Sequence, residues 1–75
     1  MEYTILVHQA EEGGFWSEVP TLPGCYTQGE TIDEALHNAK EAIESYLIVL
    51  KEDMVAAPIE ESLFIGKIRV EVAGL

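Results

Sequence analysis

The stretch PTLPGCYTQGETIDEAL, residues 20–36, restricts the fold of this chain more than any other. Pro20 and Pro23 each fix a backbone φ angle, and Gly24 can adopt the positive φ that residues with a Cβ resist. Residues 25–28 are then suited to a short strand. A loop specified this closely is expected to serve either a fixed geometry or a binding surface.

A long helix is predicted to follow this loop. Thr31 and Glu34 have the spacing of a capping box, in which the hydroxyl accepts a backbone N–H of the first turn and the carboxylate reaches back to the Thr31 N–H. The helix is expected to run to Glu52 or Asp53, and Pro58 prevents any continuation. Apolar residues at helical spacing form one stripe, widened by Ala35 and Ala42: Ile32, Leu36, Ala39, Ile43, Tyr46, Leu47 and Leu50.

Alternation with a period of two predicts three more strands. Residues 2–10 alternate, Gly13-Gly14 suits a hairpin turn, and residues 15–19 are expected to pair antiparallel with the first strand. Residues 67–72 also alternate, and residues 63–65 extend this last strand. The first strand carries Tyr3, Ile5 and Val7 on one face and Thr4, Leu6 and His8 on the other.

This order of elements predicts an α+β fold with β-β-β-α-β topology. The first three strands form an antiparallel meander, and the helix covers one face of the sheet in a two-layer arrangement. A right-handed crossover would place the fourth strand beside the first and parallel to it, which gives the sheet order 3-2-1-4. Residues 1–75 are expected to form a single domain.

Charge and size restrict the partners. The chain has 75 residues, with 14 acidic and 4 basic side chains and a net charge of −10. Such a surface repels nucleic acid and attracts a basic protein. A chain this small buries a modest core, so we expect a homodimer or a higher homo-oligomer. The lone cysteine and the absence of a signal peptide or apolar span predict a cytoplasmic protein.

The sequence predicts no catalytic, cofactor or metal site. A two-metal nuclease needs a carboxylate cluster, including one in the middle of the first strand, and residues 3–8 contain none. His8, His37 and Cys25 match no zinc spacing and are expected to be ordinary surface or packing residues. Trp16 has two interpretations of equal weight. It is either a shielded residue of the sheet face or an anchor in an interface.

The chain resembles the HicB-like antitoxin domain. Members show an acidic glycine turn before an aromatic residue, as in EEGGFW here, followed by a P-D-L-P-G-C-x-T-x-G-x-T-x-x-E-A-x-x-N-A-x-E-A pattern. The resemblance covers residues 3–60, with one departure at Thr21, where members usually carry Asp. The matching residues are Pro20, Leu22, Pro23, Gly24, Cys25, Thr27, Gly29, Thr31, Glu34, Ala35, Asn38, Ala39, Glu41 and Ala42.

The resemblance implies a partial ribonuclease H-like fold and a role as the antitoxin of a type II toxin–antitoxin pair. The implied partner is a HicA-type toxin, a small basic RNA-cleaving protein whose active site the antitoxin masks. Many members also carry a C-terminal DNA-binding segment. Only 17 residues follow Pro58 and they resemble a strand and a tail, so we expect no C-terminal DNA-binding domain and no direct nucleic acid binding.

The leading hypothesis is therefore a non-enzymatic inhibitor of such a toxin. The acids expected to meet the toxin are Glu11, Glu12, Glu18 and Glu30, and the expected apolar anchors are Trp16, Leu22 and Tyr26. One alternative is an orphan domain of the same family, acting as a dimeric regulator or a small-ligand binder without a toxin. The other is a degenerate metal-dependent nuclease, for which no turnover is expected.

Overall fold

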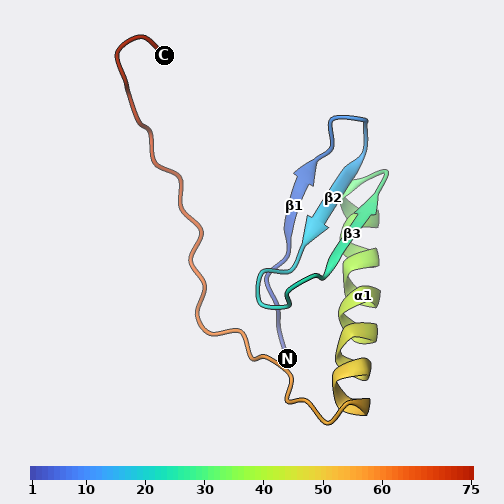
Figure 1. Cartoon of the computed structure of the whole chain (residues 1–75). Coiled ribbons are helices and arrows are strands. Elements are labelled where there is room, and N and C mark those ends of the chain that lie inside the picture. Colours follow the sequence, from blue (N-terminus) through green and yellow to red (C-terminus); the bar gives the residue numbers. More distant parts are fainter.

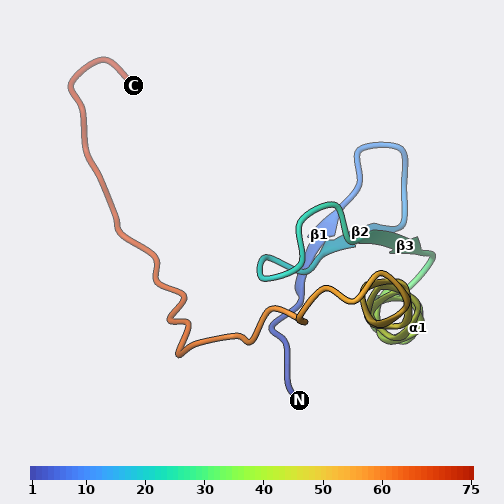
Figure 2. The same ribbon diagram turned by 60° about the horizontal axis from the view of Figure 1, so that its bottom comes forward.

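The computed structural model describes all residues from 1 to 75 and contains three strands and one long helix (Figure 1). The strands β1 (Leu6–Gln9), β2 (Phe15–Glu18) and β3 (Tyr26–Gly29) form one antiparallel sheet in the order β1-β2-β3. Helix α1 (Ile32–Glu52) lies across one face of this sheet, and the opposite face carries no covering element (Figure 2). The predicted α+β class and the three-stranded meander are confirmed.

The β1–β2 hairpin closes through the predicted glycine turn. Gly13 and Gly14 have φ values of 101° and 72°, which explains why glycine occupies both positions. The Ala10 N–H donates to the Gly14 carbonyl at 3.0 Å, and the Gly13 N–H donates back to the Ala10 carbonyl at 3.2 Å. The turn sets a register in which Val7 faces Ser17.

The proline-rich loop between β2 and β3 forms the centre of the core. Val19, Leu22 and Cys25 are all buried and pack together, and Leu22 is 0 % exposed. Backbone hydrogen bonds of 3.0–3.1 Å link these three residues in sequence, and Gly24 supplies the positive φ of 81° that the turn needs. Tyr46 of α1 donates its hydroxyl to the Pro23 carbonyl at 2.9 Å. The loop therefore ties the sheet to the helix.

The start of α1 differs in one detail from a regular capping box. The Thr31 hydroxyl accepts the Glu34 N–H at 3.1 Å, as predicted. The Glu34 carboxylate reaches back to the N–H of Glu30 at 3.2 Å, one residue before the expected Thr31. The helix ends at Glu52 with Asp53 as its C-cap, in agreement with the predicted end.

Small residues let the helix approach the sheet closely. Ala35 and Ala39 are fully buried, and a Cβ at Gly29 would lie 2.5 Å from the Ala35 nitrogen. The buried Ser17 hydroxyl is hydrogen-bonded to Thr27, whose hydroxyl also donates to the Ala35 carbonyl at 3.3 Å. This contact fixes the helix against β2 and β3 at its N-terminal end.

The predicted apolar stripe is only partly buried. Ile43 and Leu47 pack against the core, whereas Ile32 and Leu36 are exposed. The helix faces β3 and β2 with Ala35 and Ala39. The bulkier Ile43 and Leu47 lie on the side of α1 towards β1, beside a hollow that leaves this flank only partly covered.

The predicted fourth strand is wrong for the single chain. The sheet has three strands, and no backbone hydrogen bond joins residues 61–75 to it. This segment runs away from the sheet and ends far from it (Figures 1 and 2). The first three positions of the predicted order 3-2-1-4 hold, and the position beside β1 is empty.

The chain after α1 is nevertheless anchored beside the first residues. The Tyr3 hydroxyl donates to the Pro58 carbonyl at 2.6 Å. The Glu60 carboxylate accepts the Thr4 N–H at 2.6 Å and the Thr4 hydroxyl at 2.9 Å. The Thr21 hydroxyl also donates to the Glu60 carboxylate, at 3.4 Å. Glu60 thereby fixes the point from which residues 61–75 depart.

This anchor is expected to depend on pH. The backbone hydrogen bond from Thr4 lowers the pKa of Glu60, side-chain hydrogen bonds from Thr4 and Thr21 lower it further, and partial desolvation acts against them. Because the folded pKa lies below the unfolded one, the anchor is intact above the ordinary carboxyl pKa of about 4.3 and is lost as the pH falls through the lowered value. The Thr4 amide resonance should follow this titration in NMR spectra. Glu60→Gln should abolish the titration of this resonance and Glu61→Gln should preserve it; a Thr4 resonance that titrates unchanged in Glu60→Gln would contradict the assignment.

Candidate partner-binding site

Three aromatic rings lie in a row on the sheet face opposite α1. The register pairs His8 of β1 with Trp16 of β2, and Tyr26 of β3 pairs with the neighbouring Glu18. The His8 ring stacks on Trp16 with centroids 4.2 Å apart and an interplanar angle of 19°. The Tyr26 ring lies 6.3 Å from Trp16, tilted by 54°. We call His8, Trp16 and Tyr26 the aromatic face.

The outward direction of these rings follows from strand alternation. Ser17, between Trp16 and Glu18, is fully buried against the helix layer, so its two neighbours point the other way. Trp16 is 37 % exposed and Tyr26 is 66 % exposed. Phe15 is half-buried on the helix side. His8 covers one face of the indole, and the exposed part of the Trp16 ring remains open to a partner.

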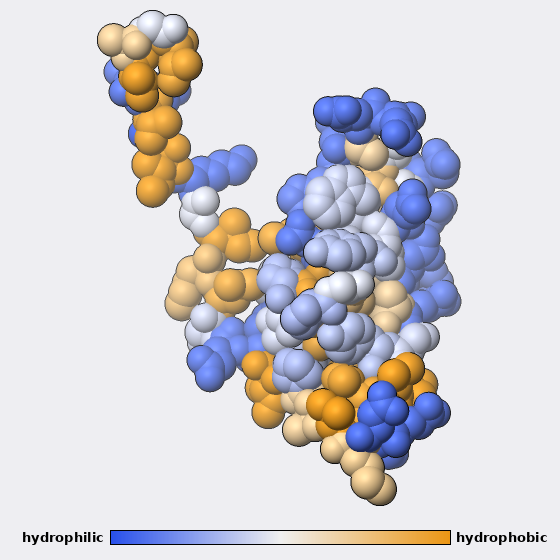
Figure 3. Space-filling model, in the orientation of Figure 1, coloured by the Kyte–Doolittle hydropathy of each residue, from blue (hydrophilic) through white to orange (hydrophobic).

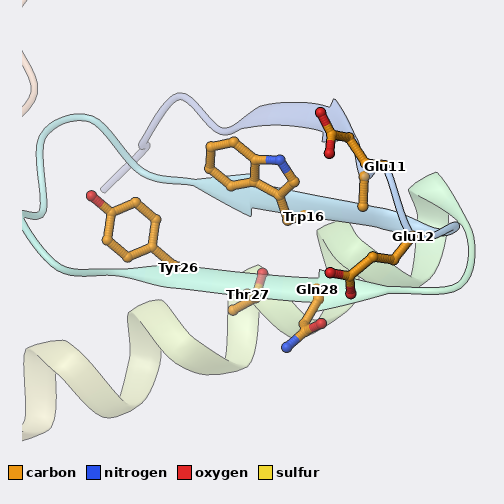
Figure 4. Close-up of a pocket in the computed structure, with 7 residues that line it drawn as sticks. Glu11, Glu12, Trp16, Tyr26, Thr27 and Gln28 are labelled. Carbon is orange, nitrogen blue, oxygen red and sulfur yellow. The ribbon is translucent and has the colours of Figure 1, made fainter.

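Carboxylates surround the aromatic face. Glu18 Oε2 lies 2.8 Å from His8 Nε2, which holds the stacked imidazole in place. Glu11 and Glu12, from the β1–β2 turn, line a shallow hollow of about 480 Å³ together with Trp16 and Tyr26. Figure 4 shows both glutamates at one end of this hollow, Trp16 in the middle and Tyr26 at the other end. The surface therefore joins acidic and aromatic groups.

The structure sorts the predicted contact residues into three places. Glu11, Glu12, Trp16, Glu18 and Tyr26 lie together on or beside the aromatic face. Glu30 lines an adjoining hollow of about 240 Å³ with Glu12 and Glu34, so the acidic surface continues towards the start of α1. Leu22 is fully buried in the core. Its expected role as an exposed anchor is corrected, because its side chain has no surface to offer a partner.

Two residues that flank Trp16 are not among the predicted contact residues. His8 was interpreted as an ordinary surface residue, and Gln28 was not considered, although both face Trp16 in the register. The Gly13-Gly14 pair alone could not have found His8, because a two-residue turn centred on it would set His8 opposite Val19. The observed three-residue loop, residues 11–13, sets His8 opposite Trp16 instead.

The arrangement is suited to binding cationic side chains. Carboxylates accept charge-assisted hydrogen bonds from Arg and Lys, and exposed aromatic faces attract the same cations.

Burial raises the pKa of the Cys25 thiol, which keeps the fraction of reactive thiolate low. No group of three His, Cys, Asp or Glu side chains is placed to hold a metal ion. The one helix of this fold is not long and apolar enough to cross a membrane.

Comparison with known proteins shows which family this chain resembles. A family described as the HicB-like antitoxin of bacterial toxin–antitoxin systems matches residues 3–71. A UPF0150 protein of Archaeoglobus fulgidus is 42 % identical over 72 residues, which covers 96 % of each chain. A UPF0150 protein of Thermoplasma acidophilum is 50 % identical over 52 residues, covering 69 % of this chain and 75 % of its own.

A third relative, a UPF0150 protein of Helicobacter pylori, is 40 % identical over 67 residues, covering 89 % of this chain and 93 % of its own. The family match spans the whole sheet, the helix and most of the segment after it. This chain belongs to the HicB-like antitoxin family of bacterial toxin–antitoxin systems.

Proposed function

We propose that the chain acts as an antitoxin by binding a small basic RNA-cleaving toxin of the HicA type and covering its active site. The observation that carries this proposal is the aromatic face, an uncovered row of rings flanked by Glu11, Glu12 and Glu18. Family membership supports the antitoxin role, and the chemistry of the face supports a cationic partner.

The face is built for contact with a protein. Interface energy is concentrated in aromatic anchors such as Trp and Tyr, and both lie here on a rigid sheet. The stacking of His8 on Trp16 limits the rotamers of both rings before a partner arrives. Binding therefore costs little side-chain entropy at the centre of the contact.

The charge distribution supports the choice of partner. Residues 1–60 carry twelve acidic and two basic side chains, so the folded body has a charge of −10. An RNA-cleaving protein needs clustered cations to hold phosphates, and the same cations attract this body. Occupation of that cationic surface excludes RNA from the toxin without any chemical step by the antitoxin.

The test is the affinity of the purified chain for the basic protein encoded next to it, measured at several salt concentrations. We expect tight binding that weakens as salt rises, because the encounter is electrostatically steered. The double variant Glu11→Gln/Glu12→Gln should lower the association rate about tenfold at low salt. The matched variant Glu44→Gln/Glu52→Gln makes the same charge change on α1 and should leave the rate nearly unchanged.

Two results would contradict the proposal. One is the absence of binding at low salt, which would favour an orphan dimeric regulator or small-ligand binder of the same family. The other is an equal effect of both double variants, because it would show that only the net charge matters and that the acidic turn is not at the contact.

A further inference from the structure

The C-terminal segment, residues 61–75, is the least protected apolar part of the molecule. Every residue in it is exposed. Phe64 is 90 % exposed and Ile68 is 88 % exposed, and Val70 and Val72 are also largely exposed. Figure 3 shows the segment as a mostly hydrophobic arm that stands away from the body. Apolar surface on this scale marks an interaction site.

The dimensions of the chain show how much surface the arm leaves open. A compact chain of 8.3 kDa exposes about 4,600 Å², whereas this chain exposes 6353 Å². Its radius of gyration is 15.4 Å, against about 11 Å for a compact domain of this length. The excess of about 1,700 Å² per chain is on the scale that stable protein–protein interfaces bury.

The outer edge of β1 is a place where an additional strand can join the sheet. β1 pairs with β2 on one side only, so its other edge has unpaired backbone groups. Ile43 and Leu47 of α1 lie beneath this edge and line a hollow of about 310 Å³ with Tyr3 and Ile5. A strand added here would pair with β1 and cover the open flank of the helix.

The arm has the pattern that this position requires. Phe64, Ile68, Val70 and Val72 would share one face of a strand, while Lys67, Arg69 and Glu71 would share the other. The apolar face suits the flank of α1. The cationic face would lie beside the acidic outer surface of the sheet, where Glu18 is found. Residues 61–75 are neutral overall, so they can approach a body of charge −10 without repulsion.

We infer that the arm pairs with the β1 edge of a second copy of this chain, and that the two copies exchange arms to form a homodimer. The anchor at Glu60 fixes the start of the arm beside Thr4, and from there the arm leaves its own sheet (Figure 2). Reciprocal exchange fills two edges with two arms and buries both apolar faces. The dimer uses the β1 edge and leaves the aromatic face free, so it stands independently of toxin binding.

The first test is the molar mass of the full chain in solution. We expect twice the chain mass of 8.3 kDa for the unchanged protein and for Ile48→Glu, which places a charge on an exposed residue of α1. Ile68→Glu should give a single chain mass, because the charge would enter the buried face of the exchanged strand. A monomeric unchanged protein, or a dimer that survives Ile68→Glu, would overturn the inference.

The second test needs no change at a buried position. One chain, without isotope labelling, carries a spin label at Glu71→Cys. This chain is refolded together with a second, ¹⁵N-labelled chain that is otherwise unchanged. Cys25 is buried and does not compete for the label. Exchange predicts broadening of the Leu6–Gln9 amides in the ¹⁵N-labelled chain. Absence of this broadening would overturn the inference, because it would mean that the arm is free or pairs with its own β1.

Discussion

Replacing Trp16 with alanine is expected to weaken toxin binding by at least about 30-fold, or about 2 kcal/mol, the usual effect of losing a central aromatic anchor. The ring lies in the middle of the aromatic face, with His8 stacked on it and Tyr26 beside it. Its removal would also release the imidazole from its position. The measurement is the dissociation constant of the complex by calorimetry at fixed salt.

The fold should tolerate this substitution, since Trp16 lies on the open sheet face and outside the buried core of Val19, Leu22 and Cys25. Trp16→Phe should recover part of the affinity. Ile48→Ala, which truncates an exposed apolar residue on α1, serves as the control and should bind like the unchanged chain. If Trp16→Ala bound the toxin with unchanged affinity, the aromatic face would not be the contact.

The substitution Gly29→Ala is expected to cause the largest loss of stability of any single methyl group added to this chain. The new Cβ would lie 2.5 Å from the Ala35 nitrogen and 2.9 Å from the Glu34 carbonyl carbon, and backbone atoms cannot yield as a flexible side chain can. Separating β3 from α1 would also disturb the bond from Thr27 to the Ala35 carbonyl. We expect a loss of about 3 kcal/mol in the free energy of unfolding, which would lower the midpoint of thermal unfolding by more than about 10 °C.

Ser45→Ala is the control, because Ser45 is exposed on α1 and lies outside both the sheet contact and the arm. Both proteins are compared at one concentration, since association would shift the midpoint. A midpoint for Gly29→Ala equal to that of Ser45→Ala would show that the helix does not approach the sheet as closely as described.

The sequence predicted the local elements well because their signals are local. The Gly13-Gly14 turn, the Thr31 cap and the proline loop depend on backbone conformations that a few residues determine by themselves. The sheet order of the first three strands followed from the short connections between them. These signals also brought most of the acidic residues proposed to contact the toxin to one surface, because the turn and β2 adjoin.

The failures concern properties that depend on distant parts of the chain. Leu22 lies in a proline-rich loop, and loops are usually at the surface. Only the tertiary packing shows that its side chain belongs to the core. Residues 63–72 have a strand pattern, but alternation does not identify the edge that a strand joins or the chain that supplies it.

The most direct test of the proposed contact is an NMR titration of the ¹⁵N-labelled chain with the unlabelled toxin. Trp16 is the only tryptophan, so its indole N–H gives one resolved signal at the centre of the aromatic face. We predict large shifts of this indole and of amides in β2, β3 and the Glu11–Glu12 turn, with α1 little affected. Shifts confined to α1, with the indole signal unmoved at saturation, would contradict the account.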